Sequence, residues 1–259
     1  MKDKPEDKSL PDKTRTSQTL ARGLTILNCF RENQSEMGIK DLAGQLALPQ
    51  TVVARLVATL VQFGYLYQNP QTKKYLLGIA AFTLGLNAEL ALPLKHTASP
   101  FLERLAQASK ETVSLNIVDP VTMDGVCIAS IDSPAQIKLT TRVGSVRPLH
   151  RGASRKVLLA YMEGWQQDQY MTRLNLDAAS QRLLRSEIAE IRERGYAVSE
   201  EELDEGAFAV AAPVLSKDGK LLAGIALAGP LFRKTPESLA KWILLVTQTA
   251  QEVARTASD

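Results

Sequence analysis

The chain has 259 residues, of which 45% are hydrophobic and 23% are charged; this length and composition suit a globular protein of one large domain or two domains. No apolar run approaches the roughly 18 residues that a membrane-spanning helix needs, and the N-terminus carries charges and prolines where a secretion signal needs an apolar core. Cys29 and Cys127 are too few and too far apart to form a disulfide framework or, by themselves, a four-ligand zinc site. We therefore expect a cytoplasmic protein without a membrane partner, a metal or another cofactor.

The positive charge is concentrated in the first third of the chain. Residues 1–85 hold eleven Lys and Arg against seven Asp and Glu, a balance of +4, whereas the remainder holds 20 basic and 21 acidic residues. A basic module joined to a near-neutral one favours a polyanionic partner for the first module.

The N-terminal pattern predicts a winged helix-turn-helix domain over residues 17–78, preceded by a disordered arm over residues 1–16. Apolar residues recur at helical spacing after Ser17 and again between Ile39 and Leu46. Pro49 opens a third helix that ends at Gly64. Two short apolar segments on either side of the turn at 69–72 then predict a β-hairpin. The buried face of the third helix is expected to consist of Val53, Leu56, Val57 and Leu60.

This arrangement suits double-stranded DNA, because the major groove admits one helix whose N-terminal residues contact base edges. Gln50, Thr51, Val52, Ala54 and Arg55 are the candidate contacts of the third helix. Gln50 can pair with adenine, Arg55 with guanine or a phosphate, and the apolar side chains with a thymine methyl group. Phosphate contacts are expected from Arg22, Lys40, Lys73 and Lys74. The alternative is a small helical interaction domain in which Arg55 and Lys73 are ordinary solvent-exposed residues.

The rest of the chain predicts a linker helix over residues 79–93 and an α/β domain over residues 94–259. A helix is expected to begin at Ser99-Pro100. Alternating or short apolar runs predict five strands, and helices fall between the third and fourth strands and at the C-terminus. The five expected strands are 113–118, 125–131, 137–143, 207–215 and 221–228.

Several segments in order resemble the IclR-type bacterial transcriptional regulators. In the first domain they are SQTLARGLTILNCF, IKDLAGQLALPQTVVARLVATLVQFGYL and NPQTKKYLLG; in the second they are RVGSVRPLHRGASRKVLLAYM, IRERGYAVSEEELDEGAFAVAAPV and DGKLLAGIALAGP. The resemblance covers nearly all of residues 17–256. It implies an α+β protein with an N-terminal winged helix-turn-helix, a linker helix and a GAF-like effector-binding domain. It also implies a homodimer or homotetramer that represses or activates catabolic genes in response to a small molecule.

Carried onto this chain, the resemblance places the effector pocket at Ala153, Ser154, Ser199, Ala207, Ala209, Ala226 and Ala228. Members that bind small carboxylates or keto acids often have acidic, cysteine and serine residues where this chain has Ser199, Ala209, Ala226 and Ala228, and glycine where it has Arg155. If Arg155 or Arg142 points inward, either could pair with a carboxylate, which favours a larger acid of aromatic or sugar origin. Alternatively, Arg155 faces solvent or another subunit.

A second class of function stays open at this stage: a metabolite-binding protein or enzyme whose N-terminal module serves protein association. Ser154 and Lys156 suggest a serine–lysine pair only by proximity, with no third group to orient them. The acidic run at residues 200–205 has no accompanying histidine. We therefore predict no catalytic residues. For a dimer that binds DNA, the operator is expected to be a near-palindrome.

Overall fold

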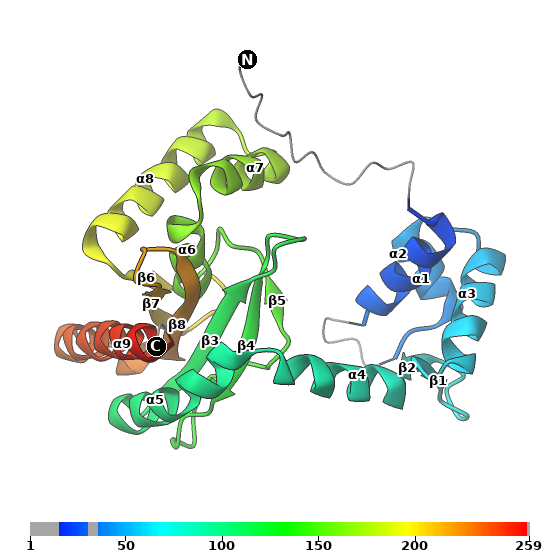
Figure 1. Cartoon of the computed structure of the whole chain (residues 1–259), viewed down its shortest axis with the longest axis horizontal. Helices are drawn as coiled ribbons and strands as arrows, with labels where there is room; N and C mark the ends of the chain where they lie inside the picture. The colour runs from blue at the N-terminus through cyan, green and yellow to red at the C-terminus, as the bar shows by residue number, and fades with distance from the viewer. Residues whose placement is uncertain (1–15, 31–35, 258–259) are drawn as a thin grey trace, which may run out of the picture. The chain divides into compact units, whose positions relative to one another are not determined.

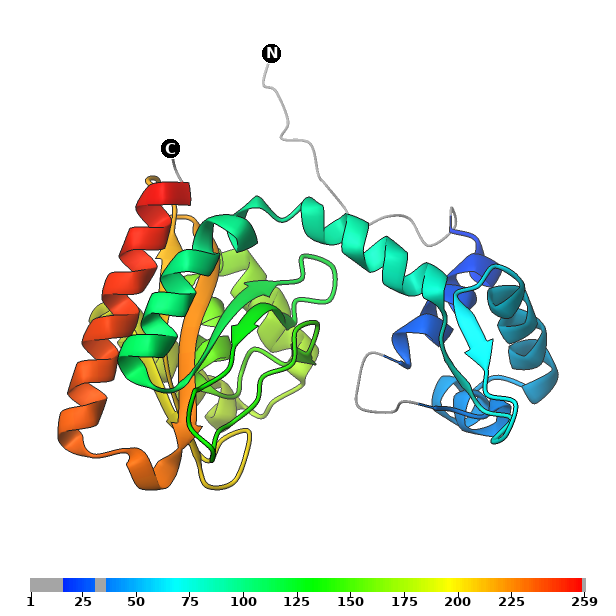
Figure 2. The same cartoon turned by 90° about the horizontal axis from the view of Figure 1, so that it is seen from below.

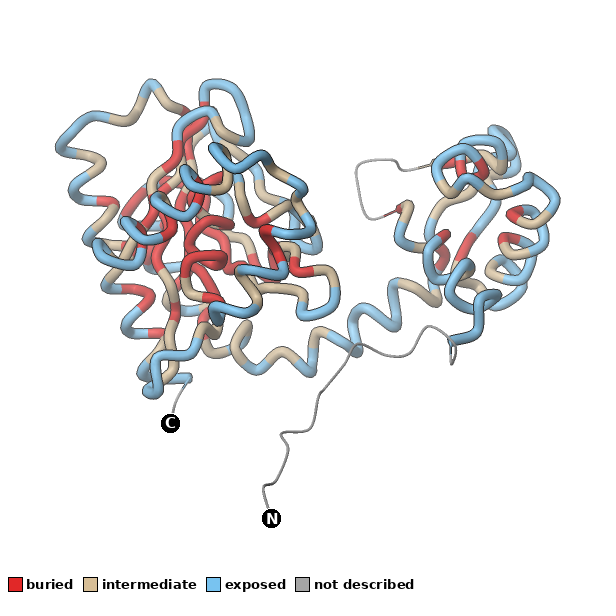
Figure 3. Tube along the Cα trace, turned by 90° about the horizontal axis from the view of Figure 1, so that it is seen from above, coloured by how far each residue is buried: buried red, intermediate tan, exposed pale blue. Residues whose placement is uncertain are grey.

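The computed structural model describes residues 16–30 and 36–257, which fold as two compact units divided between Ala91 and Leu92. The arm expected over residues 1–16 lies outside this description, apart from Thr16. Buried residues gather inside each unit, as the colouring in Figure 3 shows. Each unit therefore has its own core.

The first unit combines three short helices, a small hairpin and a fourth helix (Figure 1). Its elements are α1 (Gln18–Asn28), α2 (Ile39–Leu46), α3 (Gln50–Gln62), β1 (Leu66–Gln68), β2 (Tyr75–Leu77) and α4 (Ile79–Leu90). The Ser17 side chain accepts a hydrogen bond from the backbone N–H of Leu20 and so caps α1. Ile26, Leu42, Val53 and Val57 are fully buried between the helices, so tertiary packing holds helices of this modest length in place.

Two details of this unit differ from the sequence-based expectation. Leu20 and Leu24, which contributed to the apolar spacing of the first helix, are exposed, and Ile26 is the residue of α1 that is buried. Pro49 is the N-cap of α3 rather than its first helical residue; a backbone N–H would be unpaired in either position, so the absence of one in proline costs no hydrogen bond.

Helix α4 is apolar along its whole length but buries none of its residues. Ile79, Phe82 and Leu90 are each at least 60% exposed, and the tube in Figure 3 shows no buried segment along this helix. A helix that is hydrophobic on all sides is normally covered, but in the described part of the chain α4 is left mostly uncovered apart from its contact with β1.

The second unit is a six-stranded antiparallel sheet between two helical layers (Figure 1). Its strands are β3 (Thr112–Val118), β4 (Gly125–Ile131), β5 (Val146–Arg147), β6 (Ala197–Glu200), β7 (Ala207–Leu215) and β8 (Leu221–Pro230), in the order β5-β4-β3-β8-β7-β6. Its helices are α5 (Pro93–Ser109), α6 (Ala153–Tyr161), α7 (Gly164–Leu174), α8 (Ala178–Arg194), the 3₁₀ turn η1 (Leu231–Arg233) and α9 (Pro236–Ala257). Because side chains alternate along a strand, the two sheet faces have different residues.

One face packs against α5 and α9, which lie side by side along the sheet (Figure 2). It is built from Val, Ile, Leu and Phe, including the ring of Phe208, which stacks on Trp242 with centroids 4.4 Å apart. The other face packs against the layer of α6, α7 and α8 and carries small side chains such as Ala211 and Ala226. The sequence therefore encodes an apolar face and a face of small residues in the same strands.

The second unit differs from the sequence-based expectation in four places. Residues 137–143 form no strand although their apolar residues alternate; the backbone carbonyl of Leu139 accepts a hydrogen bond from Thr112 Oγ1 at 2.5 Å, and that of Ile137 accepts one from Arg233 at 2.9 Å. Side-chain hydrogen bonds to these carbonyls therefore hold the segment where a strand would have formed backbone hydrogen bonds. Strands β5 and β6 were not expected. Helix α5 begins at Pro93, not at Ser99, and Pro100 lies inside it.

Candidate nucleic-acid interface and ligand site

Helices α2 and α3 form a helix-turn-helix. Their axes are bent by 115° across the short connection at Ala47–Pro49, within the range of this motif. Ala47 closes α2 with a left-handed backbone, φ +50°, which an alanine adopts only where the surrounding structure requires it. Leu42 of α2 and Val53 of α3 are both fully buried, so the angle is fixed by packing as well as by the turn.

The buried side of α3 leaves its expected DNA-contacting side exposed. Val53 and Val57 are fully buried, and Leu56 and Leu60 are partly buried. The candidate contact residues Gln50, Thr51, Ala54 and Arg55 are exposed, and Val52 is half-buried. Of the expected phosphate contacts, Arg22 on α1, Lys40 in the first turn of α2, and Lys73 and Lys74 in the hairpin are also exposed.

The wing is the hairpin of β1 and β2, and its turn is anchored by Glu36, which the sequence analysis did not single out. The Glu36 carboxylate accepts hydrogen bonds from Asn69 Nδ2 at 2.5 Å and from Thr72 Oγ1 at 2.8 Å. These bonds, that of Asn69 above all, lower the pKa of Glu36. Met37 pairs with Tyr75 as a short third strand of the wing. Lys73 and Lys74 therefore project from a fixed turn.

The expected ligand site lies on the face of the sheet that packs against α6. Ala209 of β7 pairs with Ser199 of β6 and with Ala228 of β8. Ala207 and Ala226 share this face by strand alternation. Ser199 Oγ accepts the backbone N–H of Ala153 at 2.9 Å, which joins the start of α6 to the sheet edge. Six of the nine expected residues are thus brought together.

Arg155 points inward from α6. It is 3% exposed, and its Nη1 donates to Asn116 Oδ1. A Cβ atom at Gly125 would overlap the arginine side chain. Because glycine has no Cβ, Gly125 leaves the space on β4 that the Arg155 side chain occupies. Arg142, the other expected carboxylate partner, is exposed, and Ser154 is half-buried.

Three further polar residues of this face were missed. Ser114 and Asn116 of β3 and Ser130 of β4 share it, since Ser114 pairs with both Ser130 and Ala226. Asn116 Nδ2 donates to Ser114 Oγ at 3.0 Å. The signal was present in the sequence, because Ser114 and Asn116 alternate with apolar Val113, Leu115 and Ile117.

The serine–lysine pair considered from sequence is not assembled. Lys156 Nζ instead contacts the carboxylates of Glu202 at 2.9 Å and Glu187 at 3.0 Å. Glu202 also accepts the backbone N–H of Gly152 at 2.9 Å. These contacts hold the acidic loop at 200–205 against the N-terminus of α6. Across residues 16–30 and 36–257, no group of three or more His, Cys, Asp or Glu side chains could hold a metal.

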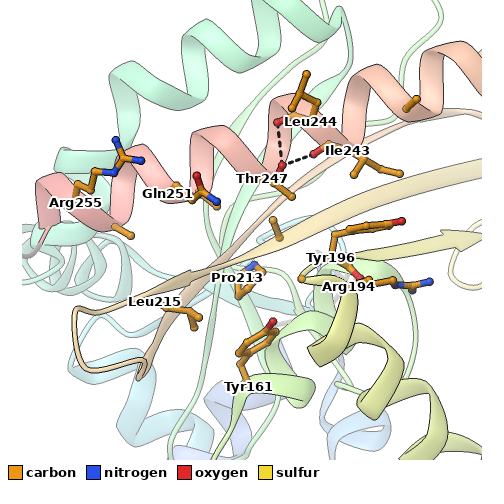
Figure 4. A pocket seen from close by; sticks show the side chains of 15 residues that line it. Tyr161, Arg194, Tyr196, Pro213, Leu215, Ile243, Leu244, Thr247, Gln251 and Arg255 are labelled. Atoms are coloured by element: carbon orange, nitrogen blue, oxygen red, sulfur yellow. Dashed lines mark hydrogen bonds between the residues drawn. The ribbon is translucent and has the colours of Figure 1, made fainter.

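A separate groove of about 700 Å³ runs between α9 and the end of β7 (Figure 4). Tyr161, Tyr196 and Pro213 line one side, and Ile243, Leu244 and Thr247 of α9 line the other. None of the expected effector residues lines it. The groove and the Arg155 site are therefore different features of the second unit.

Comparison with known proteins identifies the family. Residues 19–70 match the IclR helix-turn-helix domain, and residues 89–255 match the C-terminal domain of the bacterial transcriptional regulator IclR. The chain belongs to the IclR family of bacterial transcriptional regulators. Within the described ranges, no single helix is long and apolar enough to cross a membrane, although α2 and α3 meet the length and composition requirement when counted together as a bent pair.

IclR-family relatives span almost the whole chain. The transcriptional regulator XynR of Escherichia coli is 30% identical over 92% of this chain and 96% of its own length. The Escherichia coli repressor IclR is 26% identical over 91% of this chain and 88% of its own. A solved IclR homolog from Microbacterium hydrocarbonoxydans, in complex with 4-hydroxybenzoate, shares the fold with a TM-score of 0.75, at 22% identity over 92% of this chain and 98% of that one.

These relatives are regulators of transcription and not enzymes. Like them, this chain is a ligand-responsive transcriptional regulator with an N-terminal DNA-binding domain and a C-terminal α/β domain. The family assignment confirms the fold class and the function expected from the sequence; the individual contact residues are taken up below as proposals.

Proposed function

We propose that this regulator binds its operator by inserting α3 into the major groove, with the wing on the phosphate backbone. The observation that carries the proposal is the exposed face of α3 on a helix-turn-helix whose opposite face is buried. Gln50, Thr51 and Arg55 are the base-contacting candidates, with apolar contacts from Val52 and Ala54. Arg22, Lys40, Lys73 and Lys74 bind phosphates, which set position and affinity without discriminating sequence.

The active form in this proposal is a homodimer or a homotetramer built from homodimers. Helix α4 is apolar on all sides and unburied, and α1 adds the exposed Leu20 and Leu24. A second copy of the chain would cover these surfaces. Two symmetry-related α3 helices on one side of the duplex require half-sites about 34–36 Å apart, so the operator is a near-palindrome. The protein works in the cytoplasm, where it meets chromosomal DNA.

The effector is a small acid bound on the α6-facing side of the sheet, at Arg155 with Ala153, Ser154, Ser199, Ala207, Ala209, Ala226 and Ala228, and it regulates a catabolic operon. Four alanines on two neighbouring strands leave little side-chain volume on this face, and the inward guanidinium of Arg155 is suited to a carboxylate. Exposed Arg142 is a second, outer candidate. The effector changes DNA affinity by favouring one arrangement of the paired DNA-binding domains, transmitted through α4, and it must bind the two arrangements with different affinity.

The test is binding of the purified protein to fragments of its own upstream intergenic DNA, with unrelated DNA as competitor. We expect competitor-resistant binding whose log–log salt slope is about −0.9 for each phosphate contact. Lys73→Ala should weaken binding to all sequences and reduce that slope by about one contact, whereas Arg55→Ala should reduce the preference over competitor.

The matched control is Lys241→Ala, which removes an exposed lysine from α9 of the other unit and should leave DNA binding unchanged. If Arg55→Ala and Lys73→Ala bind DNA as the wild type does, α3 and the wing are not the interface. The N-terminal unit would then be a protein-association module.

A further inference from the structure

Arg155 is a buried cation without a counter-ion. Its side chain is almost completely excluded from solvent, Nη1 donates to the neutral amide of Asn116, and Nε is buried with no hydrogen-bond partner. No carboxylate in the described residues forms an ion pair with it; the charged or ionisable groups that act on it are Cys127 and Arg147. A buried charge is normally paired, because desolvation is otherwise uncompensated.

Neither Arg155 nor its neighbour removes this charge imbalance by changing protonation. Burial lowers the pKa of Arg155 to about 10, so the guanidinium stays positive at neutral pH. Burial raises the pKa of the Cys127 thiol to about 11, so the thiol stays neutral. The site therefore holds a net positive charge with unused hydrogen-bonding capacity.

A row of polar side chains continues from Arg155 across the sheet. Asn116 connects the guanidinium to Ser114 through two hydrogen bonds, and Ser114 lies directly opposite Ser130 on β4. Ser130 Oγ is buried and has no hydrogen-bond partner. Unused polar atoms thus stand at both ends of the row, Arg155 Nε at one end and Ser130 Oγ at the other, with the small Ala226 beside Ser114.

We propose that this row, Arg155–Asn116–Ser114–Ser130, binds a small aliphatic hydroxy acid. The carboxylate becomes the counter-ion of Arg155 and accepts from Nε, while a hydroxyl group further along the ligand bonds Ser130 Oγ. Ser114 and Asn116, two apart on one strand face, are separated by roughly 7 Å, so a ligand that joins Arg155 to Ser130 must span about this distance. An aromatic acid without such hydroxyl groups leaves Ser130 unsatisfied. This inference rests on the effector site proposed above and specifies its ligand class.

Titration calorimetry of the full-length protein tests the proposal with three probes. Gluconate carries both the carboxylate and the hydroxyl groups, sorbitol carries the hydroxyl groups alone, and benzoate carries the carboxylate alone. We expect gluconate to bind more tightly than either of the others. Lactate and glycerate, as shorter hydroxy acids, define the chain length that fits.

Two variants assign the contacts. Arg155→Met should weaken hydroxy-acid binding by at least about 30-fold, because a charge-assisted pair in a buried site is lost, whereas Arg182→Met, the same change at an exposed arginine of α8, should leave it unchanged. Ser130→Ala should weaken binding about 3- to 10-fold, the size of one neutral hydrogen bond. Without ligand, Arg155→Met should melt no lower than the wild type, because it removes an unpaired charge.

The outcomes separate this inference from the proposed function. If the wild type binds its operator but gluconate, lactate and glycerate bind no better than sorbitol, or if Arg155→Met binds them as the wild type does, the hydroxy-acid site is refuted and the DNA-binding role stands. If operator binding itself is absent while hydroxy acids bind through Arg155, the regulatory role of the N-terminal unit fails and the ligand site stands.

Discussion

The two faces of the six-stranded sheet are made by alternate residues of the same strands, yet they differ in almost every property. Toward α5 and α9, β3 presents Val113 and Leu115, both fully buried in an apolar layer. Toward α6, the same strand presents Ser114 and Asn116. The apolar face gains free energy from burial, whereas the polar face carries hydrogen-bonding groups, of which Arg155 Nε and Ser130 Oγ have no partner among the described residues. If the ligand binds as proposed, strand alternation assigns stability to one face of the sheet and ligand recognition to the other.

The largest effect that tests this division is expected at Phe208. Phe208 is 1% exposed and stacks on Trp242, so Phe208→Ala should lower the free energy of unfolding by about 3–5 kcal/mol. Ala209→Ser, one residue along on the other face, should change it by about 1 kcal/mol or less. Chemical denaturation of both variants gives the comparison, and equal losses would show that the two faces contribute alike to stability.

A second comparison is between two arginines, Arg233, which has a carboxylate partner, and Arg155, which has none within the described ranges. Arg233 is paired with the buried Glu111, with Nε and Nη2 donating to its two carboxylate oxygens at 2.8 and 2.7 Å. Arg233→Met should lower the free energy of unfolding by about 2–3 kcal/mol, because it leaves a buried carboxylate unpaired. This figure is reduced because Arg233 itself is partly exposed.

The same substitution at Arg155 should not lower the free energy of unfolding, because no carboxylate is left behind. Thermal or urea denaturation of the two methionine variants in parallel measures the difference. A similar loss at both positions would mean that Arg155 is held by a partner as strong as Glu111.

Alternation also explains how far the sequence could predict this molecule. The helical spacing of Val53 and Val57 predicted the buried side of α3 and thereby its exposed contact side. In residues 137–143 the same kind of inference failed, because alternation records only which side chains are apolar. Whether a ladder forms depends on a neighbouring strand, and here Thr112 and Arg233 bind the carbonyls of Leu139 and Ile137 instead.

The geometry of the proposed ligand site could be predicted only in part, because it depends on contacts between residues far apart in the chain. The inward direction of Arg155 was one of two open possibilities, since its hydrogen bond to Asn116 joins residues 39 apart in the chain. Ser130 came to lie opposite Ser114 through a pairing that shifts register between Leu115 and Asn116. A β-bulge of this kind moves one extra residue into a strand, and nothing in the local pattern of β4 marks it.

The last expected effect concerns pH and Cys127 on the polar face. Because burial raises the pKa of this thiol to about 11, the unfolded chain loses the proton at lower pH than the folded protein does. The contribution of Cys127 to stability is therefore complete below about pH 9 and is lost as the pH rises toward about 11, by up to about 3 kcal/mol. The wild type should lose stability more steeply in this range than Cys127→Ala does, measured by denaturation at each pH. Equal slopes would contradict this assignment.

The uncovered apolar surface of α4 has a consequence for how operator occupancy depends on the concentration of the protein. If a second copy covers this helix, as proposed, association precedes operator binding, and below the dimer dissociation constant the concentration of the DNA-binding species rises with the square of the chain concentration. A twofold change in synthesis would then alter operator occupancy by up to fourfold. The steepness of the response would then be set by α4 (Ile79–Leu90), an apolar helix that contains none of the proposed DNA-contacting residues.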